Sequence, residues 1–157
     1  MSVIHVPLGE QSYDVHVQSG ILDRSGTILK DALGDAAGRR VLLVADAPIS
    51  ETHAETVARS LEASDFAVAF ATVESVEANK SLSALQALLE AAAAERIDRS
   101  GVIVGVGGGI VGDLAGFLAA SWLRGIPLLQ VPTSLLAMVD ASIGGKTGVN
   151  LPLPDGV

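Results

Sequence analysis

The sequence predicts an α/β fold in which a parallel sheet carries helices on both faces and is preceded by an N-terminal β-hairpin. Short, almost wholly apolar runs such as VLLVA and VIVGV have the length and composition of buried parallel strands. These runs alternate with stretches of helical periodicity, which is the order expected of βαβ units with right-handed crossovers. A chain of 157 residues, with 49% hydrophobic residues, 18% charged residues and 17 glycines, suffices for one such domain, residues 1–157.

Residues 3–17 alternate between apolar and polar side chains around the turn LGEQ, which predicts a two-stranded hairpin. We expect the outward positions to include His5, Asp14 and His16. A metal-ligand role for either histidine is disfavoured, because a metal site needs several convergent partners.

From residue 21 onward the pattern alternates between helix and strand. The first helix is expected to close at Gly34, and a threonine, Thr52, is expected to cap the second. The third helix places Leu82, Leu85 and Leu89 on one face. The predicted elements are helix 21–33, strand 40–46, helix 52–63, strand 66–73, helix 80–97, strand 101–107, helix 110–123 and strand 126–132.

Composition excludes several classes of function. A net charge of -8 argues against a nucleic-acid partner, and the absence of cysteine rules out disulfides and thiolate chemistry. Asp113, Arg124 and Asp140 interrupt the apolar C-terminal third, so no membrane span is expected. The N-terminus lacks the layout of a signal peptide, and a cytoplasmic location is therefore the default expectation.

Three glycines, Gly107, Gly108 and Gly109, lie between a predicted buried strand and a helix. A bare backbone at a helix N-terminus can approach and bind a phosphate, as in Rossmann-like dinucleotide domains. Gly107, Gly109 and Gly112 satisfy the GxGxxG spacing, but no acidic residue follows about 20 positions later to hold a ribose. Tight helix packing is the alternative explanation for these glycines.

Carboxylates elsewhere are candidates for the ribose. Asp46 ends one predicted strand, and Glu77 with Lys80 follows another, at the edge of the sheet where ligands of parallel sheets bind. Helix capping or solvated charge is the competing interpretation of these side chains.

The segment 124–150 is more specific, because it concentrates polar side chains in an otherwise apolar stretch, where they need partners or a ligand. These are Thr133, Ser134, Asp140, Ser142, Lys146 and Asn150. Gly144, Gly145 and Lys146 resemble a phosphate clamp. A Walker loop is excluded because Asp140 stands where that motif requires glycine.

The stretch GGGIVGDLAGFLAASWLRGIPLLQVPTSLLAMVDASIGGKTGVN, together with VEANKSL upstream, resembles the signature of the 3-dehydroquinate synthases. Sister sugar-phosphate cyclases share the triple glycine and VPT but usually depart from VDASIGGKTGVN. Iron-dependent alcohol and glycerol dehydrogenases share the fold but not this second block. The family usually has threonine where Ser134 stands, a change that keeps the hydroxyl.

The resemblance implies a site for NAD and for a sugar acid phosphate, with Asp140 and Lys146 as the catalytic residues that face the substrate. The implied cofactor-binding residues are Asp46, Glu77, Lys80, Gly107, Gly108, Gly109, Asp113, Thr133, Ser134 and Lys146. The implied reaction converts 3-deoxy-D-arabino-heptulosonate 7-phosphate to 3-dehydroquinate and phosphate in the shikimate pathway of aromatic amino acid biosynthesis. It proceeds by transient oxidation with NAD, phosphate elimination, re-reduction and an intramolecular aldol step, so the net reaction is that of a carbon-oxygen lyase.

The resemblance also implies parts that this sequence does not show. Family members bind zinc or cobalt through one glutamate and two histidines of a following helical domain, and His5, His16 and His53 match none of these ligands. No metal ligand is therefore assigned. Family members follow GVN with a Gly-Lys-Asn that supplies a second catalytic lysine, whereas the tail LPLPDGV reaches Gly156 and then Val157. Either a longer loop postpones that motif beyond Val157 or the motif is missing, so this second lysine is not assigned.

We therefore expect a chain truncated relative to the family, inactive by itself, from an enzyme that is usually a homodimer. A non-catalytic NAD-binding module, a related cyclase and an iron-type dehydrogenase are the alternatives.

Overall fold

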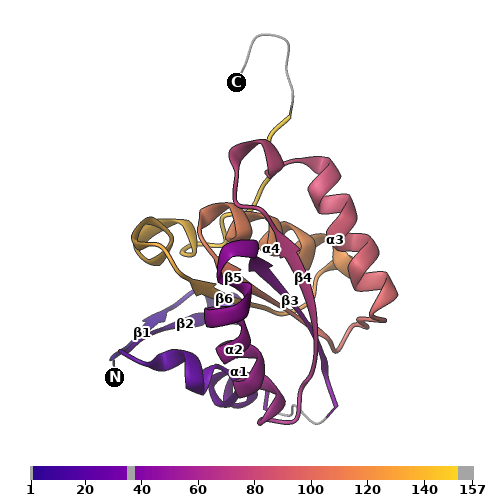
Figure 1. Ribbon diagram of the computed structural model, residues 1–157. Helices are drawn as coiled ribbons and strands as arrows, with labels where there is room; N and C mark the ends of the chain where they lie inside the picture. The colour runs from indigo at the N-terminus through magenta and orange to yellow at the C-terminus, as the bar shows by residue number, and fades with distance from the viewer. Residues whose placement is uncertain (1, 35–37, 152–157) are drawn as a thin grey trace.

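The computed structural model describes residues 2–34 and 38–151. The strands are β1 (Ser2–Val6), β2 (Tyr13–Val17), β3 (Arg40–Asp46), β4 (Ala67–Val73), β5 (Val102–Gly107) and β6 (Leu128–Pro132) (Figure 1). The helices are α1 (Ser25–Leu33), α2 (Glu55–Glu62), α3 (Leu82–Ala94) and α4 (Gly109–Ser121). Short 3-10 or π turns occupy Gly9–Gln11, Ile21–Arg24, Ala47–Ile49, Ser50–Ala54, Glu77–Asn79, Trp122–Arg124 and Ala137–Ala141.

The four strands of the main sheet are parallel and lie in the order β4-β3-β5-β6, which confirms the predicted sheet. From β3 the chain crosses through α2 to β4, and it then returns past β3 through α3 to reach β5. The carboxyl ends of β3 and β5 are therefore neighbours from which the chain departs in opposite directions. Such a switch point leaves a crevice in which open α/β sheets bind their ligands.

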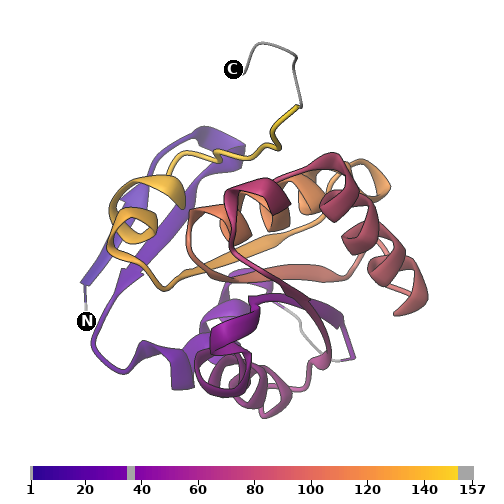
Figure 2. The ribbon, with the colours of Figure 1, turned by 45° about the horizontal axis from the view of Figure 1, so that its top comes forward.

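Helices cover both faces of this sheet, as predicted, and the three layers are visible in Figure 2. Val41, Leu43 and Ala45 of β3 pack in one hydrophobic cluster with α1 and α2. Leu42 and Val44, on the opposite side of the same strand, pack in a second cluster with α3 and α4. The continuous apolar run of β3 is explained by this double burial, because both sides of the strand are covered.

The predicted helix 21–33 is divided in two. Arg24 has φ -111° and ψ 2°, which ends the 3-10 turn before α1 begins at Ser25. The Ser25 hydroxyl donates to the Leu22 carbonyl at 2.9 Å, so it satisfies a carbonyl of the turn at the junction. The predicted C-terminus is confirmed, since Gly34 has φ 74° and donates to the Lys30 carbonyl.

Two details of the helix predictions are wrong. Thr52 does not cap α2, because it lies inside the turn Ser50–Ala54 and its hydroxyl donates back to the Ile49 carbonyl at 3.3 Å. On α3 the buried residues are Leu85, Leu88 and Ala92, and Leu89 packs against the same cluster as predicted, whereas Leu82 is 53% exposed. Because Ser81 caps the helix, Leu82 is its first residue, and the packed stripe begins one turn later.

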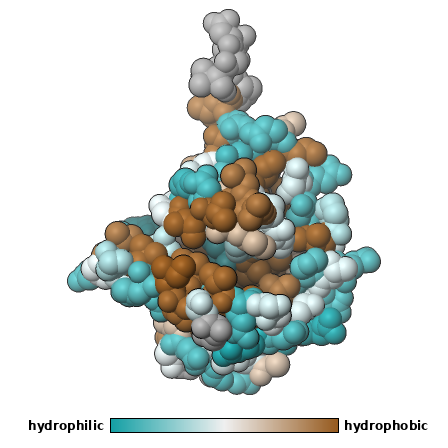
Figure 3. All heavy atoms as spheres, turned by 90° about the vertical axis from the view of Figure 1, so that its left-hand side faces the viewer, coloured by the Kyte–Doolittle hydropathy of each residue, from teal (hydrophilic) through white to brown (hydrophobic). Residues whose placement is uncertain are grey.

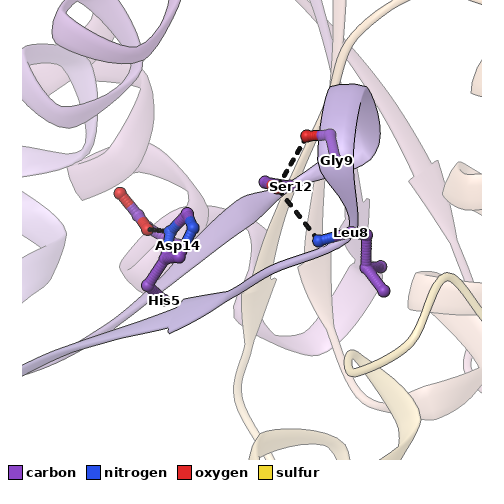
Figure 4. Close-up of polar contacts among 5 residues, drawn as sticks. All are labelled: His5, Leu8, Gly9, Ser12 and Asp14. Atoms are coloured by element: carbon purple, nitrogen blue, oxygen red, sulfur yellow. Dashed lines mark hydrogen bonds and ion pairs between the residues drawn. The ribbon is translucent and has the colours of Figure 1, made fainter.

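The N-terminal hairpin pairs β1 with β2 in antiparallel register, as predicted. His5 and Asp14 face each other across the strands with Nδ1 and Oδ1 2.7 Å apart, and both are exposed (Figure 4). Ser12 closes the turn by accepting from the Leu8 N–H and donating to the Gly9 carbonyl. The prediction for His16 is wrong. This side chain is half-buried where β2 borders a cavity, and its Nδ1 finds no hydrogen-bond partner within the described ranges.

Helix α4 lies unusually close to the sheet. A Cβ on Gly105 of β5 would lie 2.9 Å from the Ala115 Cβ, and one on Gly112 would lie 3.2 Å from the Gln130 Oε1. The Gln130 amide donates to the Gly112 carbonyl at 3.0 Å, so a polar contact joins β6 to the helix. The apolar residues on one side of α4 are core, whereas Leu135, Leu136 and Val139 farther along are exposed. No helix within the described ranges is long and apolar enough to cross a bilayer.

We predict that Gly26→Ala destabilises the fold. A Cβ at residue 26 of α1 would lie 2.0 Å from the Ser60 carbonyl oxygen of α2. Alanine gains about 1 kcal/mol of helix propensity over glycine, but overpacking against a rigid backbone costs about 1–3 kcal/mol. The cost of the clash should therefore exceed the gain in helix propensity, and thermal unfolding followed by circular dichroism should show a Tm lower by several degrees. Gly148→Ala is the control, since its Cβ meets no atom within 4 Å, and equal melting of both variants would refute the assigned packing.

Candidate functional site

The predicted nucleotide residues gather at the carboxyl ends of the parallel strands. Asp46 ends β3, and its Oδ1 accepts a hydrogen bond from the Ser75 N–H at 3.1 Å. Ser75 follows β4, so this contact joins the ends of two neighbouring strands. It fixes one carboxylate oxygen of Asp46 beside the crevice at the switch point.

Gly107, Gly108 and Gly109 connect β5 to α4 at the other side of the crevice. Gly107 is required by packing, because its Cβ would lie 2.7 Å from the Val111 side chain. A Cβ on Gly108 would find only the Ser134 hydroxyl at 3.6 Å, and one on Gly109 only the Ala141 Cβ at 3.4 Å. These are ordinary contact distances, and neither residue has a positive φ. The fold therefore requires glycine at position 107 but not at positions 108 and 109.

Helix α4 begins at this turn with Gly108 as its N-cap, and no side chain caps it. The first N–H groups of a helix have no partner within the helix, and its N-terminus carries a partial positive charge. An uncapped N-terminus behind a bare backbone is well suited to an anion such as a pyrophosphate. The bare backbone at Gly108 and Gly109 thus leaves the N-terminus of α4 accessible to an anionic group.

Lys80 and Asp113 form an ion pair across the site. The Lys80 Nζ lies 2.5 Å from the Asp113 Oδ2, and the two side chains are only 22% and 16% exposed. Lys80 comes from the loop after β4 and Asp113 from the second turn of α4. Because the pair is partly buried, solvent and salt screen it less than they screen a surface pair.

Thr133 and Ser134 follow β6 and adjoin the glycine turn. The Thr133 N–H donates to the Gly107 carbonyl at 2.9 Å, which holds the ends of β5 and β6 together. The Ser134 hydroxyl accepts from the Ala137 N–H at 3.3 Å and so caps a short helical segment, residues 135–141, that the sequence analysis did not anticipate.

Asp140 and Lys146 form the second ion pair, and they are 61% and 49% exposed. Gly144 and Gly145 turn the loop between them with φ values of 81° and 68°, which few other residues adopt. The Gly144 N–H donates to the Tyr13 hydroxyl at 2.9 Å, so the loop is attached to the hairpin. The predicted substrate pair is brought together, but it lies nearer to solvent than the Lys80 pair.

Lys146 also borders a cavity of about 750 Å³ between the hairpin and the edge strand β6. The face that holds β1, β2 and the loop after β6 is largely hydrophobic (Figure 3). Exposed apolar side chains of these elements include Ile4, Val17, Leu128, Met138 and Val139.

Glu77 is held by the segment that follows Lys146. The Asn150 side-chain amide donates to the Glu77 Oε1 at 2.6 Å, and the Asn150 backbone N–H donates to the Lys80 carbonyl at 2.7 Å. Ser81 and Asn150 form an isolated parallel bridge. Residues 77–81 are therefore fixed by a part of the chain about 70 residues away.

No group of three or more histidine, aspartate and glutamate side chains that could hold a metal ion occurs in residues 2–34 and 38–151. Zinc or cobalt therefore does not fit the described residues. The expectation about a Gly-Lys-Asn lysine in the tail LPLPDGV falls mostly on residues 152–157, which lie outside the described residues.

Asp98, a side chain with a lowered pKa, lies away from this site. Hydrogen bonds from the Ser100 hydroxyl and N–H lower the pKa of Asp98 below its ordinary value. Asp98 precedes β5, at the opposite edge of the sheet from the crevice. We attribute this shift to a local turn and not to function.

Four residues of the site were not predicted from sequence as functional or positioning residues: Tyr13, Ser75, Gln130 and Asn150. Asn150 was singled out as a polar residue in an apolar segment, and this is the signal that could have identified it. Tyr13 contacts a residue 131 positions away, and no local pattern indicates such a contact.

Known proteins resemble this chain over most of its length. Residues 70–155 match the family described as 3-dehydroquinate synthase N-terminal. The 3-dehydroquinate synthase of Symbiobacterium thermophilum is 47% identical over 145 residues, which are 92% of this chain and 40% of that protein. The chain thus spans about two fifths of the length of such relatives.

Two solved structures share the fold. One is 2-deoxy-scyllo-inosose synthase complexed with carbaglucose-6-phosphate, NAD+ and Co2+, with a TM-score of 0.85 and 24% identity over 96% of this chain and 40% of that one. The other is 2-epi-5-epi-valiolone synthase from Streptomyces hygroscopicus subsp. jinggangensis with NAD+ and Zn2+ bound, with a TM-score of 0.76 and 32% identity over 93% of this chain and 39% of that one. Because the match to the family description covers more than half of this chain, the chain belongs to the 3-dehydroquinate synthase family and corresponds to its N-terminal region.

Proposed function

We propose that this chain forms the NAD-binding, Rossmann-like domain, residues 1–157, of a 3-dehydroquinate synthase. The single observation that supports this most directly is the bare turn at Gly108 and Gly109 in front of the uncapped N-terminus of α4. A backbone left bare where the fold tolerates a side chain is explained by a ligand that approaches it closely. The two solved cyclases described above were determined with NAD+ bound, which makes NAD the ligand we propose.

In this proposal the turn Gly107 to Gly109 and the N–H groups at the start of α4 would hold the pyrophosphate. Asp46 and Glu77, which follow the neighbouring strands β3 and β4, would supply carboxylate oxygens for ribose hydroxyls. Lys80, held by Asp113, places a positive charge beside the phosphates. Thr133 and Ser134 border the turn from the side of β6.

The proposed substrate is 3-deoxy-D-arabino-heptulosonate 7-phosphate, and the products are 3-dehydroquinate and phosphate. When bound, NAD supplies a hydride acceptor and donor, so that a ring hydroxyl is oxidised transiently and the net reaction is a lyase reaction. Lys146 is suited to bind a carboxylate or phosphate group of the substrate as a compact point charge. Asp140 can accept a hydrogen bond from a substrate hydroxyl or from a water that relays a proton.

The Lys146 and Asp140 pair has a chemical consequence for binding. An anionic substrate competes with Asp140 for the Lys146 ammonium group. Breaking the Lys146–Asp140 ion pair costs little free energy, because both side chains are about half exposed. Asp140 is then released to accept a hydrogen bond from the substrate. Substrate binding and the availability of Asp140 are thereby linked.

The proposal assigns no metal to this chain, because its described residues offer no ligand set. Ligands for the zinc or cobalt expected of the family belong, in this proposal, to the part of the longer relatives that this chain does not span. The homodimer and the cytoplasmic location are further predictions of the same proposal.

We predict that Gly108→Ala weakens NAD binding without destabilising the fold. The added Cβ meets no protein atom closer than 3.6 Å, yet it occupies the approach of a phosphate to the backbone. Isothermal titration calorimetry with NAD+ should show affinity at least about tenfold weaker, equivalent to about 1.4 kcal/mol. The Tm should change little, whereas Gly107→Ala should lower it because of the clash with Val111. Unchanged NAD affinity in Gly108→Ala would exclude this turn as the pyrophosphate site.

We predict that this chain catalyses phosphate release once it is joined to the rest of a synthase. A chimera in which it replaces the aligned N-terminal segment of the Symbiobacterium thermophilum relative should release phosphate from 3-deoxy-D-arabino-heptulosonate 7-phosphate. The reaction should require NAD+ and produce no net NADH absorbance, while the chain alone should show no turnover. Net NADH formation with polyols would favour a dehydrogenase, and a folded chimera that binds NAD+ without turnover would favour a non-catalytic module.

In the same chimera, Lys146→Met should lower kcat/KM about a hundredfold or more, because a charge that stabilises the bound anion is lost. Lys30→Met is the matched control. Lys30 forms a 2.9 Å ion pair with Asp65, between α1 and the loop after α2, outside the strand ends that bear the site. Comparable kcat/KM losses in both variants would show that the effect is general and not specific to the site.

A further inference from the structure

We infer that Asn150 is a positioning residue for nucleotide binding, which orients Glu77 and couples the loop that contains Lys146 to the loop that contains Lys80. This inference rests on the proposed function, because it assigns Glu77 and Lys80 to the cofactor. It concerns a residue that itself contacts neither the glycine turn nor Asp46.

The contacts between Asn150 and the loop 77–81 are of two kinds. The backbone N–H of Asn150 donates to the Lys80 carbonyl at 2.7 Å, and the bridge to Ser81 aligns the two segments. The side-chain amide then reaches the Glu77 Oε1 at 2.6 Å. The backbone contacts fix the Cα position of Asn150. Its short side chain therefore loses little conformational entropy when it forms the hydrogen bond to Glu77.

The hydrogen bond to Glu77 constrains one of the two carboxylate oxygens. Within the described residues, the other oxygen, Oε2, accepts no hydrogen bond. A carboxylate has about four lone-pair sites, so Glu77 can accept from Asn150 and from a ligand hydroxyl at once. Asn150 therefore orients the carboxylate without using up its capacity to bind a ribose.

The same segment connects to the substrate loop. Lys146 lies four residues before Asn150, and between them Thr147 contacts α4 closely enough that a Cβ on Gly116 would be 2.5 Å from its Cγ2. Thr147 thus lies against α4, and three residues later Asn150 contacts the loop 77–81. Lys80 returns to the same helix through its ion pair with Asp113. This closed set of contacts joins Lys146, α4, Lys80 and Glu77.

The test uses Asn150→Ala, which removes the side-chain bond and keeps the backbone bond to Lys80. Calorimetry with NAD+ should show an affinity about threefold to tenfold weaker, the range expected for the net contribution of one typical hydrogen bond. Gln86→Ala is the matched control, because its amide donates to Glu90 at 2.9 Å on the exposed face of α3, and it should leave NAD affinity unchanged.

A double-mutant cycle separates positioning from general stability. If Asn150 acts through Glu77, then Asn150→Ala combined with Glu77→Ala should bind NAD+ no more weakly than Glu77→Ala alone. Additive losses, or a wild-type affinity in Asn150→Ala, would overturn the inference.

Hydrogen exchange of the ligand-free chain supplies a readout independent of NAD. Asn150→Ala should speed amide exchange in residues 76–81, and Gln86→Ala should not. If the wild-type chain fails to bind NAD+ while the exchange result holds, the proposed cofactor is wrong and the loop contact is right. If NAD+ binds and exchange in residues 76–81 is unchanged by Asn150→Ala, the inference is wrong and the proposed function survives.

Discussion

The placement of the site depends on how closely α4 packs against the sheet. Glycine at positions 105 and 112, together with the Gln130 amide, allows the helix to lie against β5 and β6 at a distance that side chains would prevent. Its N-terminus is consequently held at the carboxyl end of β5, directly beside the switch point. Asp46 approaches from β3, Lys80 pairs with the second turn of α4, and Thr133 bonds to the strand from which the helix departs. If a methyl group at position 105 or 112 pushed α4 away from the sheet, its N-terminus and its contact with Lys80 would move away from Asp46 and Thr133 at the same time.

The two lysine–aspartate ion pairs of the site, Lys80 with Asp113 and Lys146 with Asp140, differ in their electrostatic properties. The protein has a net charge of -8, so an anionic ligand depends on local positive charge and not on the overall field. Lys80 is held in a partly buried pair and serves as a fixed charge, whereas the more exposed pair of Lys146 and Asp140 can exchange partners with a ligand. This contrast matches the proposed roles, in which Lys80 is assigned to the cofactor phosphates, whose charge stays constant, and Lys146 to a substrate that binds and leaves.

The parallel sheet and its covering helices could be predicted from sequence because burial on both sides imposes continuous apolar runs, as in β3 and β5. The position of the site followed from topology, which brings strand ends such as Asp46 and Gly107 to one edge. Predictions failed where a local pattern competed with tertiary contacts. Leu82 has helical spacing with Leu85 but precedes the packed face, and His16 alternates like a solvent-facing residue although it borders a cavity. The contact between Asn150 and Glu77 joins distant segments, and single-sequence periodicity contains no information about such pairs.

The hydrogen bond between Tyr13 and Gly144 has a consequence for how the chain acquires its structure. It joins residues 131 positions apart, so it closes almost the longest loop that the described chain allows. A contact between residues so far apart in sequence requires a large loss of chain entropy before it contributes any stabilisation. Such contacts therefore form late in folding. The hairpin precedes the main sheet in the sequence, yet this hydrogen bond can form only after β6 and the loop beyond it are in place. Docking of the hairpin is therefore expected to be among the last steps of folding, although its two strands are neighbours in sequence and can pair early.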